Sequence, residues 1–376
     1  MSGGVDSSIT AALLVKHQQV NKPIHLIGRD NLPLKAHKMD ISAVFMRNWD
    51  TRDESGSDVG CEWEKDWEDV RRVCRHIGVP CEMTLGETGG LRIQTYSVIG
   101  HYARITYHNS RPRLTRAADP LKDQTYYLSS VKESRLAQTL FPIGHLTKPI
   151  LRELAHEMKL PTAERSESMG LCFVGERTRF AKFLAEYIPP NPGPILLHPS
   201  LTQVGTHQGL WTLTIGQNAR VPGQPRKLFV ARKDIENNAI IVVDQVNHPA
   251  LMCTAVRLCD WNWISETEEE IRELEASPST EQALAVDGIP IVSQIRHRMA
   301  PVPGRLRKVR DEPNSYEIAF SIPVHGVAPG QIGTAWKNMN IYGQREEVSE
   351  GAGPLLQWEG MWCLGCGEIE STTCLE

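Results

Sequence analysis

The first eight residues constrain the fold of this chain more than any other stretch. They read Met-Ser-Gly-Gly-Val-Asp-Ser-Ser, and the largely apolar run 9–15 follows at once. Gly3 and Gly4 carry no Cβ, so the backbone there can turn tightly and bring its N–H groups against a ligand. The apolar run predicts a helix that begins near Ser7, and a helix N-terminus attracts anions. The stretch therefore predicts a phosphate cradle.

The side chains of the same stretch suit a bound nucleotide. Ser2, Ser7 and Ser8 offer hydroxyl donors, and Asp6 can orient a nucleotide or a hydrated Mg²⁺. No lysine follows the glycines, so the loop is not of the Walker type. The alternative is a simple capped helix after a glycine-rich turn.

Composition limits the class of protein. The 376 residues are enough for two or three domains. Lys and Arg number 41 against 45 Asp and Glu, a net charge of −4, so any nucleic-acid surface must be a local basic patch. No apolar run approaches the roughly 20 residues of a membrane span. Nine irregularly spaced cysteines indicate reduced or catalytic thiols rather than a secreted disulfide framework.

The first half of the chain predicts an α/β domain. Residues 41–46 and 80–85 are short apolar strands, and residues 62–76 form the helix between them. Ligands of such folds lie at the carboxyl ends of parallel strands, which places Met46 near an adenine. A core methionine is the alternative for that residue. Cys74 on the helix is predicted to be a buried, inert thiol.

Two pieces of this α/β pattern are expected to be missing. A buried strand normally leads into a phosphate loop, and none precedes Met1. Residues 97–104 predict a strand that ends in a Gly-His turn, yet the interval 85–97 barely allows the crossover that parallel strands need. A shortened gene or splice variant would explain both gaps.

The sequence of the second half of the chain predicts mainly β-strands. The Pro-rich residues 188–194 predict a linker, and residues 266–275 a short acidic helix. Strands are expected at 207–217, 227–233, 239–244, 255–263, 291–298, 316–322 and 331–337. A small domain followed by a β-barrel is the simplest arrangement. The predicted domains are 1–190, 191–250 and 251–376.

Nine motifs spread over nearly the whole chain resemble one enzyme family. They are Ser2–Ser8, Phe45–Trp49, Gly100–Arg104, Lys122–Gln124, Glu167–Gly175, Gly205–Gly209, Thr214–Gln217, Ile295–Pro303 and Ala328–Gln331. The chain is similar to the tRNA-specific 2-thiouridylases of the N-type ATP pyrophosphatase (PP-loop) superfamily, in particular to the mitochondrial enzymes that thiolate the wobble uridine. The resemblance implies an adenine-nucleotide α-hydrolase-like parallel-sheet domain, a small central domain and a C-terminal β-barrel.

The resemblance also implies a reaction and its site residues. ATP, with Mg²⁺ implied, would adenylate the C2 carbonyl oxygen of the uridine, and a cysteine persulfide on Cys172 would then deliver sulfur. The implied catalytic residues are Cys172 and Asp6. The implied ATP-binding residues are Ser2, Gly3, Gly4, Val5, Asp6, Ser7, Ser8, Met46 and Gly100. The implied tRNA-binding residues are Lys122, Asp123, Gln124, Arg296 and His297, whose alternative is ordinary loop polarity. A protein that donates persulfide sulfur is the implied partner, and the mitochondrion the implied location.

The family uses two cysteines, and this chain departs from that pattern. Cys172, between Gly170 and Gly175, is the matching persulfide residue; a buried structural thiol is its alternative. The family's other cysteine sits in an Asn-Pro-Asp…Cys segment that is absent here, and Cys81 does not replace it. Two alternative functions follow: a catalytically impaired tRNA-binding variant, or another PP-loop adenylating synthetase. The Cys363–Cys366 spacing has no second pair, so no metal site is predicted.

Overall fold

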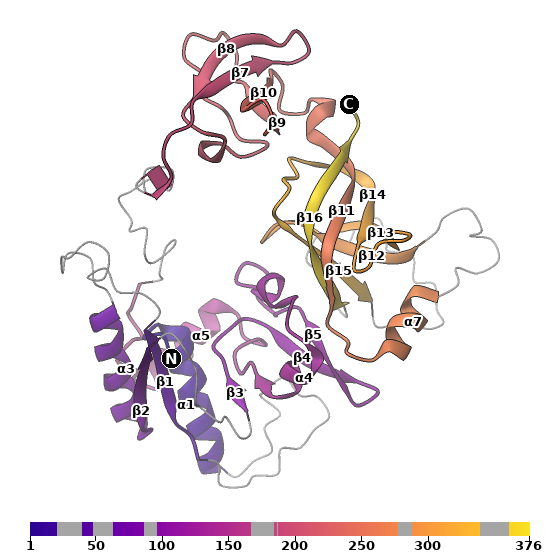
Figure 1. Cartoon of the computed structure of the whole chain (residues 1–376). Coiled ribbons are helices and arrows are strands. Elements are labelled where there is room, and N and C mark those ends of the chain that lie inside the picture. Colours follow the sequence, from indigo (N-terminus) through magenta and orange to yellow (C-terminus); the bar gives the residue numbers. More distant parts are fainter. Residues whose placement is uncertain are drawn as a thin grey trace. The chain divides into compact units, whose positions relative to one another are not determined.

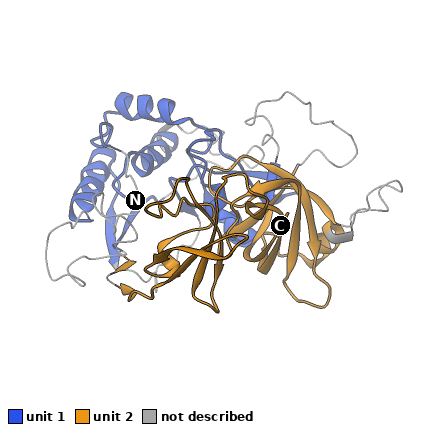
Figure 2. Ribbon diagram, turned by 90° about the horizontal axis from the view of Figure 1, so that it is seen from above, with its two compact units in different colours: residues 1–176, 339–363 blue, residues 177–338, 364–376 orange. Residues whose placement is uncertain are grey.

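A computed structural model describes residues 1–20, 40–47, 63–85, 96–166, 184–185, 187–276, 288–338 and 361–376. The chain divides into two compact units, one of residues 1–176 and 339–363 and the other of residues 177–338 and 364–376 (Figure 2). The domain boundaries near residues 190 and 250 remain predictions. Among the described residues, no helix combines the length and apolar character that a membrane span requires.

The first unit is a mixed α/β structure (Figure 1). Its elements are α1 (Val5–Val20), β1 (Ala43–Arg47), α3 (Trp63–Ile77), β2 (Cys81–Leu85), β3 (Ser97–Val98), β4 (Arg104–His108), β5 (Arg111–Thr115), η1 (Thr125–Leu128), α4 (Glu133–Ala137), β6 (Thr139–Leu140) and α5 (Lys148–Glu157). The short strands supply its parallel pairs, and the helices cover them.

The predicted parallel pair of strands is confirmed. β1 and β2 run parallel, from Ala43 opposite Cys81 to Arg47 opposite Leu85. α3 is the crossover between them, and its buried face includes Val70 and Cys74. That face packs on β1 because apolar residues at a 3.6-residue spacing all point to one side of a helix. Cys74 is a buried core thiol, as predicted.

A second parallel pair lies under α1. β3 pairs with β6, and Leu14 of α1 packs on Leu140 of that pair. On another side of α1, Ile9 packs in a cluster with Leu151 of α5. Fully burying such side chains stabilises a fold by roughly 1.5–3 kcal/mol each, so these contacts hold the start of α1 in place.

Two predictions about this unit differ from the structure in extent. α1 begins at Val5 rather than near Ser7. The strand predicted over 97–104 ends at Val98. The chain leaves the sheet there because the backbone of Tyr102 bonds instead to Gln124. The predicted gap near 85–97 falls largely on residues 86–95, which lie outside the described part.

The second unit begins with a four-stranded sheet in the order β8-β7-β10-β9. Its elements are β7 (Gly193–Leu197), β8 (Thr202–His207), η2 (Leu210–Thr212), β9 (Phe229–Asp234) and β10 (Ala239–Val243). The linker predicted over 188–194 is wrong at its end, because Gly193 already belongs to β7. The strand predicted from His207 is also wrong: β8 ends there, and Thr212 Oγ1 donates to Gly209 O at 2.6 Å to close a 3₁₀ turn.

The predicted C-terminal β-barrel is confirmed. Six strands follow the order β11-β14-β13-β12-β15-β16, and pairing of β11 with β16 closes the ring (Figure 1). The elements of this region are η3 (Pro249–Leu251), β11 (Met252–Trp263), α7 (Glu268–Ala276), β12 (Ile289–Gln294), β13 (Val302–Lys308), β14 (Tyr316–His325), β15 (Ile332–Asn338) and β16 (Met361–Cys374). Closure leaves no open sheet edge in the ring.

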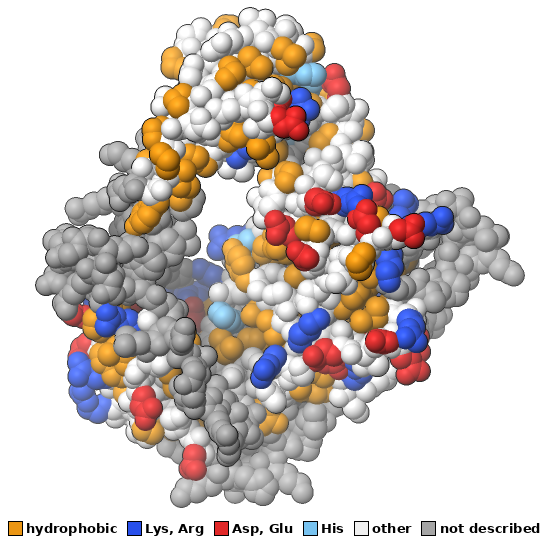
Figure 3. Space-filling model, in the orientation of Figure 1, with side chains coloured by type: hydrophobic (Ala, Val, Ile, Leu, Met, Phe, Trp, Pro, Cys, Tyr) orange, Lys and Arg blue, Asp and Glu red, His pale blue; other side chains and the backbone are white. Residues whose placement is uncertain are grey.

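The barrel surface carries both signs of charge. Figure 3 shows Lys and Arg side chains interspersed with Asp and Glu over the visible face of the barrel strands. Arg257 pairs with Glu312, and Arg307 lies 3.5 Å from Glu317. Opposite charges that neutralise one another give little net field for a polyanion. This face is therefore not the local basic patch that a nucleic-acid surface requires.

Candidate functional site

Two glycines bring the loop that leads into α1 against its neighbours. Gly3 has φ +75°, and a Cβ there would lie 2.6 Å from the backbone oxygen of Asp66 in α3. A Cβ on Gly100 would lie 3.1 Å from both the Cα and the N of Ser7. Only glycine allows such close approach between backbones. The structure therefore brings together Ser2–Ser8 and Gly100, which the sequence assigned to one ATP site.

Serine hydroxyls set the shape of the loop. Ser7 Oγ donates to Gly4 O at 3.1 Å and accepts the N–H of Ser2 at 3.2 Å. Ser8 donates to Gly4 O through both its amide, at 3.2 Å, and its Oγ, at 2.8 Å. Gly4 is thus the residue from which the helix starts, and the first-turn N–H groups that follow have no partner within the helix. Such groups, at the positive end of the helix dipole, suit a phosphate.

Asp6 is held by two side chains from distant parts of the chain. Lys148 Nζ lies 2.7 Å from Asp6 Oδ1, and the hydroxyl of Tyr102 donates to the same oxygen at 3.1 Å. Lys148 is only 8% exposed, whereas the Asp6 side chain is 34% exposed. A cation is therefore fixed beside the loop, and it can neutralise charge on a bound phosphate.

Lys148 is the functional residue that sequence reasoning missed. It is the first residue of α5, where the helix dipole is positive. A cation is unfavourable at that end of a helix. A buried lysine in an unfavourable place indicates a specific partner, which here is Asp6. The signal available in the sequence was a lysine at the start of a helix.

Arg165 anchors the loop to α3. Its NH1 donates to Gly3 O at 3.0 Å and to Asp69 at 2.6 Å, and its NH2 donates to Asp66. A guanidinium presents several donors in a fixed plane, so one side chain can bind a carbonyl and two carboxylates together. Cys172, the predicted persulfide residue, follows in residues 167–183, which lie outside the described part of the chain.

The Lys-Asp-Gln motif follows a loop organised by two aspartates. Asp119 accepts the N–H groups of Leu121 and Lys122 and, at 2.9 Å, that of Lys148. Asp123 is 3% exposed and accepts the N–H of Ala117 at 2.7 Å.

The same carboxylate of Asp123 also accepts from Thr125 Oγ1 at 2.6 Å and pairs with Arg116 at 3.3 Å. A side chain with this many partners inside the protein has no oxygen left over to read RNA. The carboxylate of Asp123 therefore positions the loop, and the tRNA contact expected at this residue stays a prediction.

Gln124 connects this loop to the phosphate site. It accepts the N–H of Tyr102 through Oε1 at 2.9 Å, and its own N–H donates to Tyr102 O at 2.9 Å. Tyr102 in turn bonds Asp6. Gln124 is thus two contacts away from the Asp6 carboxylate beside the glycine loop.

For Met46, Arg296 and His297, the other predicted site residues, the structure gives a position in the fold and no tested role. Met46 is 41% exposed near the carboxyl end of β1, where the sequence expected an adenosine contact. Arg296 and His297 follow β12 in the second unit, and Arg296 is exposed. The nucleotide contact of Met46 and the tRNA contacts of the other two stay predictions.

Two half-buried histidines near the site make stability depend on pH. Burial lowers the pKa of His101 and of His145, and Arg104 lowers that of His145 further. A histidine with a lowered folded-state pKa favours folding above the unfolded pKa of about 6.5, and this contribution is lost as the pH falls below that value. We expect the thermal midpoint to fall between pH 7 and pH 5, and to fall less in a His101→Gln/His145→Gln variant.

The matched control for that measurement is His156→Gln, which removes an exposed histidine 3.5 Å from Glu164. Its thermal midpoint should follow the pH dependence of the unmodified protein. Equal pH dependence in the double variant and the unmodified protein would contradict the assignment.

Comparisons with known proteins place the chain in one family. Residues 29–88 and 91–176 match the tRNA methyl transferase HUP domain, residues 181–244 the tRNA methyl transferase PRC-barrel domain, and residues 254–343 the aminomethyltransferase beta-barrel domain. The tRNA-specific 2-thiouridylase MnmA 2 of Geobacillus kaustophilus is 31% identical, with 88% of each chain covered.

Two further relatives agree. The tRNA-specific 2-thiouridylases MnmA of Alkaliphilus oremlandii and of Nitrosomonas eutropha are each 32% identical over 88% of this chain, and cover 91% and 92% of their own lengths. The family matches cover all three domain types, and the alignments with the relatives cover most of this chain and most of each relative. The chain belongs to the tRNA-specific 2-thiouridylase family.

Proposed function

We propose that this protein catalyses ATP-dependent 2-thiolation of the wobble uridine of mitochondrial tRNAs. The observation that carries the proposal is the Asp6–Lys148–Tyr102 group beside the glycine loop, in a chain of this family. A fixed cation and first-turn N–H groups are the chemistry that a triphosphate requires. In the proposed reaction the C2 carbonyl oxygen of the uridine attacks the α-phosphorus of ATP, and pyrophosphate leaves.

The described residues support the first of the two steps. The loop would hold the ATP phosphates, with Lys148 opposing the charge that develops on the leaving pyrophosphate. Met46 and Gly100 would contact the adenosine. Mg²⁺, held by the Asp6 carboxylate, would supply further charge neutralisation at the phosphates. The contacts of Asp6 Oδ1 with Lys148 and Tyr102 fix the orientation of this carboxylate.

Sulfur transfer is the second step. The outer sulfur of a persulfide on Cys172 would bond to C2, and AMP would leave with the former carbonyl oxygen. A second thiol, such as that of glutathione, would then attack Cys172 Sγ, which breaks the S–S bond, releases the 2-thiouridine and leaves Cys172 in a disulfide. The persulfide sulfur would come from a donor protein in the mitochondrion. Lys122, Gln124, Arg296 and His297 would contact the tRNA, with Asp123 holding the first two in place. Lysine and arginine suit phosphate contacts, and an amide suits base edges.

A thiolation assay tests the proposal. The protein is incubated with an unmodified tRNA transcript, Mg²⁺-ATP, glutathione persulfide as the source of persulfide sulfur and excess reduced glutathione, and 2-thiouridine is measured by mass spectrometry of the digested RNA. We expect ATP-dependent 2-thiouridine with the unmodified protein. Cys172→Ser should abolish it, because serine cannot carry a persulfide.

The control is Cys259→Ser, a change in a barrel strand that should leave the product unchanged. Binding of the tRNA without sulfur incorporation by the unmodified protein would support the tRNA-binding variant instead. Full turnover by Cys172→Ser, with release of AMP and no 2-thiouridine, would support a different adenylating synthetase.

A further inference from the structure

Two cysteines face each other where the barrel closes. Cys253 lies at the start of β11 and Cys374 at the end of β16, paired directly across the two strands. Their Sγ atoms are 2.6 Å apart, and both residues are free thiols. Cys253 is 2% exposed, and Cys374 is partly exposed. The two residues are 121 positions apart in the chain, so only closure of the barrel brings them together.

The strand register favours a bond between them. The N–H of Leu375 donates to Met252 O at 3.0 Å, which joins the residue after one cysteine to the residue before the other. The cysteines therefore occupy a non-hydrogen-bonded position of the antiparallel ladder, where opposite Cα atoms are about 4.5 Å apart and side chains lie closest. That separation is within the roughly 4.4–6.8 Å range of disulfides. A disulfide can form here without movement of the strands.

The pair also has a reactive member. A hydrogen bond from Cys253 lowers the pKa of the Cys374 thiol to about 7, and the same contact, together with burial, raises the pKa of Cys253. At neutral pH the more exposed sulfur is therefore substantially a thiolate. The thiolate is the form that attacks a disulfide, and a thiol with a pKa near the ambient pH attacks fastest.

We propose that Cys253 and Cys374 form a reversible disulfide site that takes low-molecular-weight disulfides, such as oxidised glutathione, as its oxidant. The Cys374 thiolate attacks one sulfur of the oxidant, a mixed disulfide forms, and the first small thiolate leaves. Cys253 then attacks Cys374 Sγ and passes its proton to the second small thiolate, which also leaves. The protein loses two electrons and two thiol hydrogens, and the oxidant becomes two thiols.

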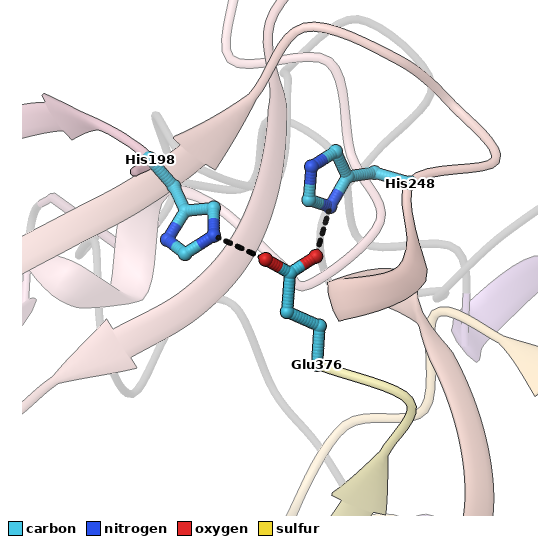
Figure 4. A group of neighbouring side chains, drawn as sticks. All are labelled: His198, His248 and Glu376. Carbon is cyan, nitrogen blue, oxygen red and sulfur yellow. Dashed lines mark hydrogen bonds and ion pairs between the residues drawn. The ribbon is translucent and has the colours of Figure 1, made fainter. Parts of the chain in front are cut away.

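The bond would act on the end of β16. Two residues beyond Cys374, the carboxylate of Glu376 lies 3.3 Å from His198 Nε2 and 4.0 Å from His248 Nδ1 (Figure 4). His198 directly follows β7 of the four-stranded sheet. The disulfide would pin the residues that carry this contact between barrel and sheet.

The two histidines and the glutamate are not a formed metal centre. The carboxylate of Glu376 lies 4.0 Å from His248 Nδ1, whereas tetrahedral zinc ligands at about 2.1 Å from the metal lie roughly 3.4 Å apart. In addition, His248 Nδ1 accepts the N–H of Ala250 at 3.2 Å, which occupies its lone pair. The hydrogen bond within the group joins His198 Nε2 and Glu376 Oε1.

The test is peptide mapping of the whole protein. The reduced protein is equilibrated with mixtures of reduced and oxidised glutathione, remaining thiols are blocked with iodoacetamide, and non-reducing digests are analysed by mass spectrometry. We expect a cross-linked peptide pair that contains Cys253 and Cys374 and disappears on treatment with dithiothreitol. The thermal midpoint of the oxidised protein should be higher by about 5 °C.

Two variants make the result specific. Cys374→Ser, at the less buried position, should remove both the cross-link and the rise in midpoint. Cys259→Ser changes another thiol of β11, whose Sγ lies 3.7 Å from Glu368 O, and should retain both. The proposal is overturned if Cys253 and Cys374 of the unmodified protein still react with iodoacetamide after incubation with oxidised glutathione alone. It is also overturned if Cys374 forms the mixed disulfide with glutathione and the reaction goes no further.

Discussion

Replacing Lys148 by methionine should lower the rate of ATP-dependent adenylation by about 100-fold or more while the chain stays folded. The substitution removes the ammonium group 2.7 Å from Asp6 and keeps most of the volume of the side chain. The loop then carries an uncompensated carboxylate where a triphosphate must bind, so both ATP affinity and the stabilisation of the leaving pyrophosphate should fall. The measurements are the Kd for ATP by titration calorimetry and tRNA-dependent AMP release.

Two controls separate the chemical role of Lys148 from a structural one. Asp6→Asn in the Lys148→Met background removes the unpaired charge, so it should recover thermal stability without recovering adenylation. Lys16→Met alters an exposed lysine of α1 and should behave like the unmodified protein. Wild-type AMP release by Lys148→Met would rule out a role for this ammonium in the reaction.

Replacing Gly3 by alanine should destabilise the first unit by about 2–4 kcal/mol and abolish ATP binding. The new Cβ would meet the backbone oxygen of Asp66 at 2.6 Å and the Arg165 guanidinium at 2.9 Å, with the backbone at φ +75°. A backbone oxygen inside a helix cannot move aside, so the loop must shift and its contact with Arg165 must break. Thermal unfolding and ATP titration measure the two effects.

Gly4→Ala is the matched control for Gly3→Ala. The added Cβ would meet only Ser2 Oγ, at 3.5 Å, which is ordinary van der Waals contact. This variant should therefore change stability by less than about 1 kcal/mol. Equal losses in the two variants would show that the loop tolerates no side chain at either position, and that contact with α3 is not the cause.

Local patterns predicted the elements whose signal is regular. The 3.6-residue apolar spacing of α3 and the short apolar runs of β1 and β2 were readable, because one buried face imposes its own period on the sequence. The local pattern alone did not predict strands β13 and β16. β13 contains Pro303 and Gly304, and β16 contains Gly365 and Gly367, which usually mark turns.

Those glycines are there for a tertiary reason. A Cβ on Gly365 would lie 2.2 Å from Asn262 O, and one on Gly304 would lie 2.6 Å from Ala319 O, each on a neighbouring strand. In a tightly closed barrel a glycine can mark close approach between strands rather than a turn. No local window of the sequence distinguishes the two cases.

The sequence by itself determined the family and the α/β and barrel architecture, and it predicts that the glycine loop binds phosphate. Those properties depend on short motifs and on local periodicity. Only the tertiary structure decided that Lys148, 142 positions away, neutralises Asp6, that Asp123 is an internal support, and that Cys253 faces Cys374. The physical reason is that a charge or a thiol acquires its role from the groups packed around it. That packing is set by the closure of sheets and the docking of helices over the whole chain.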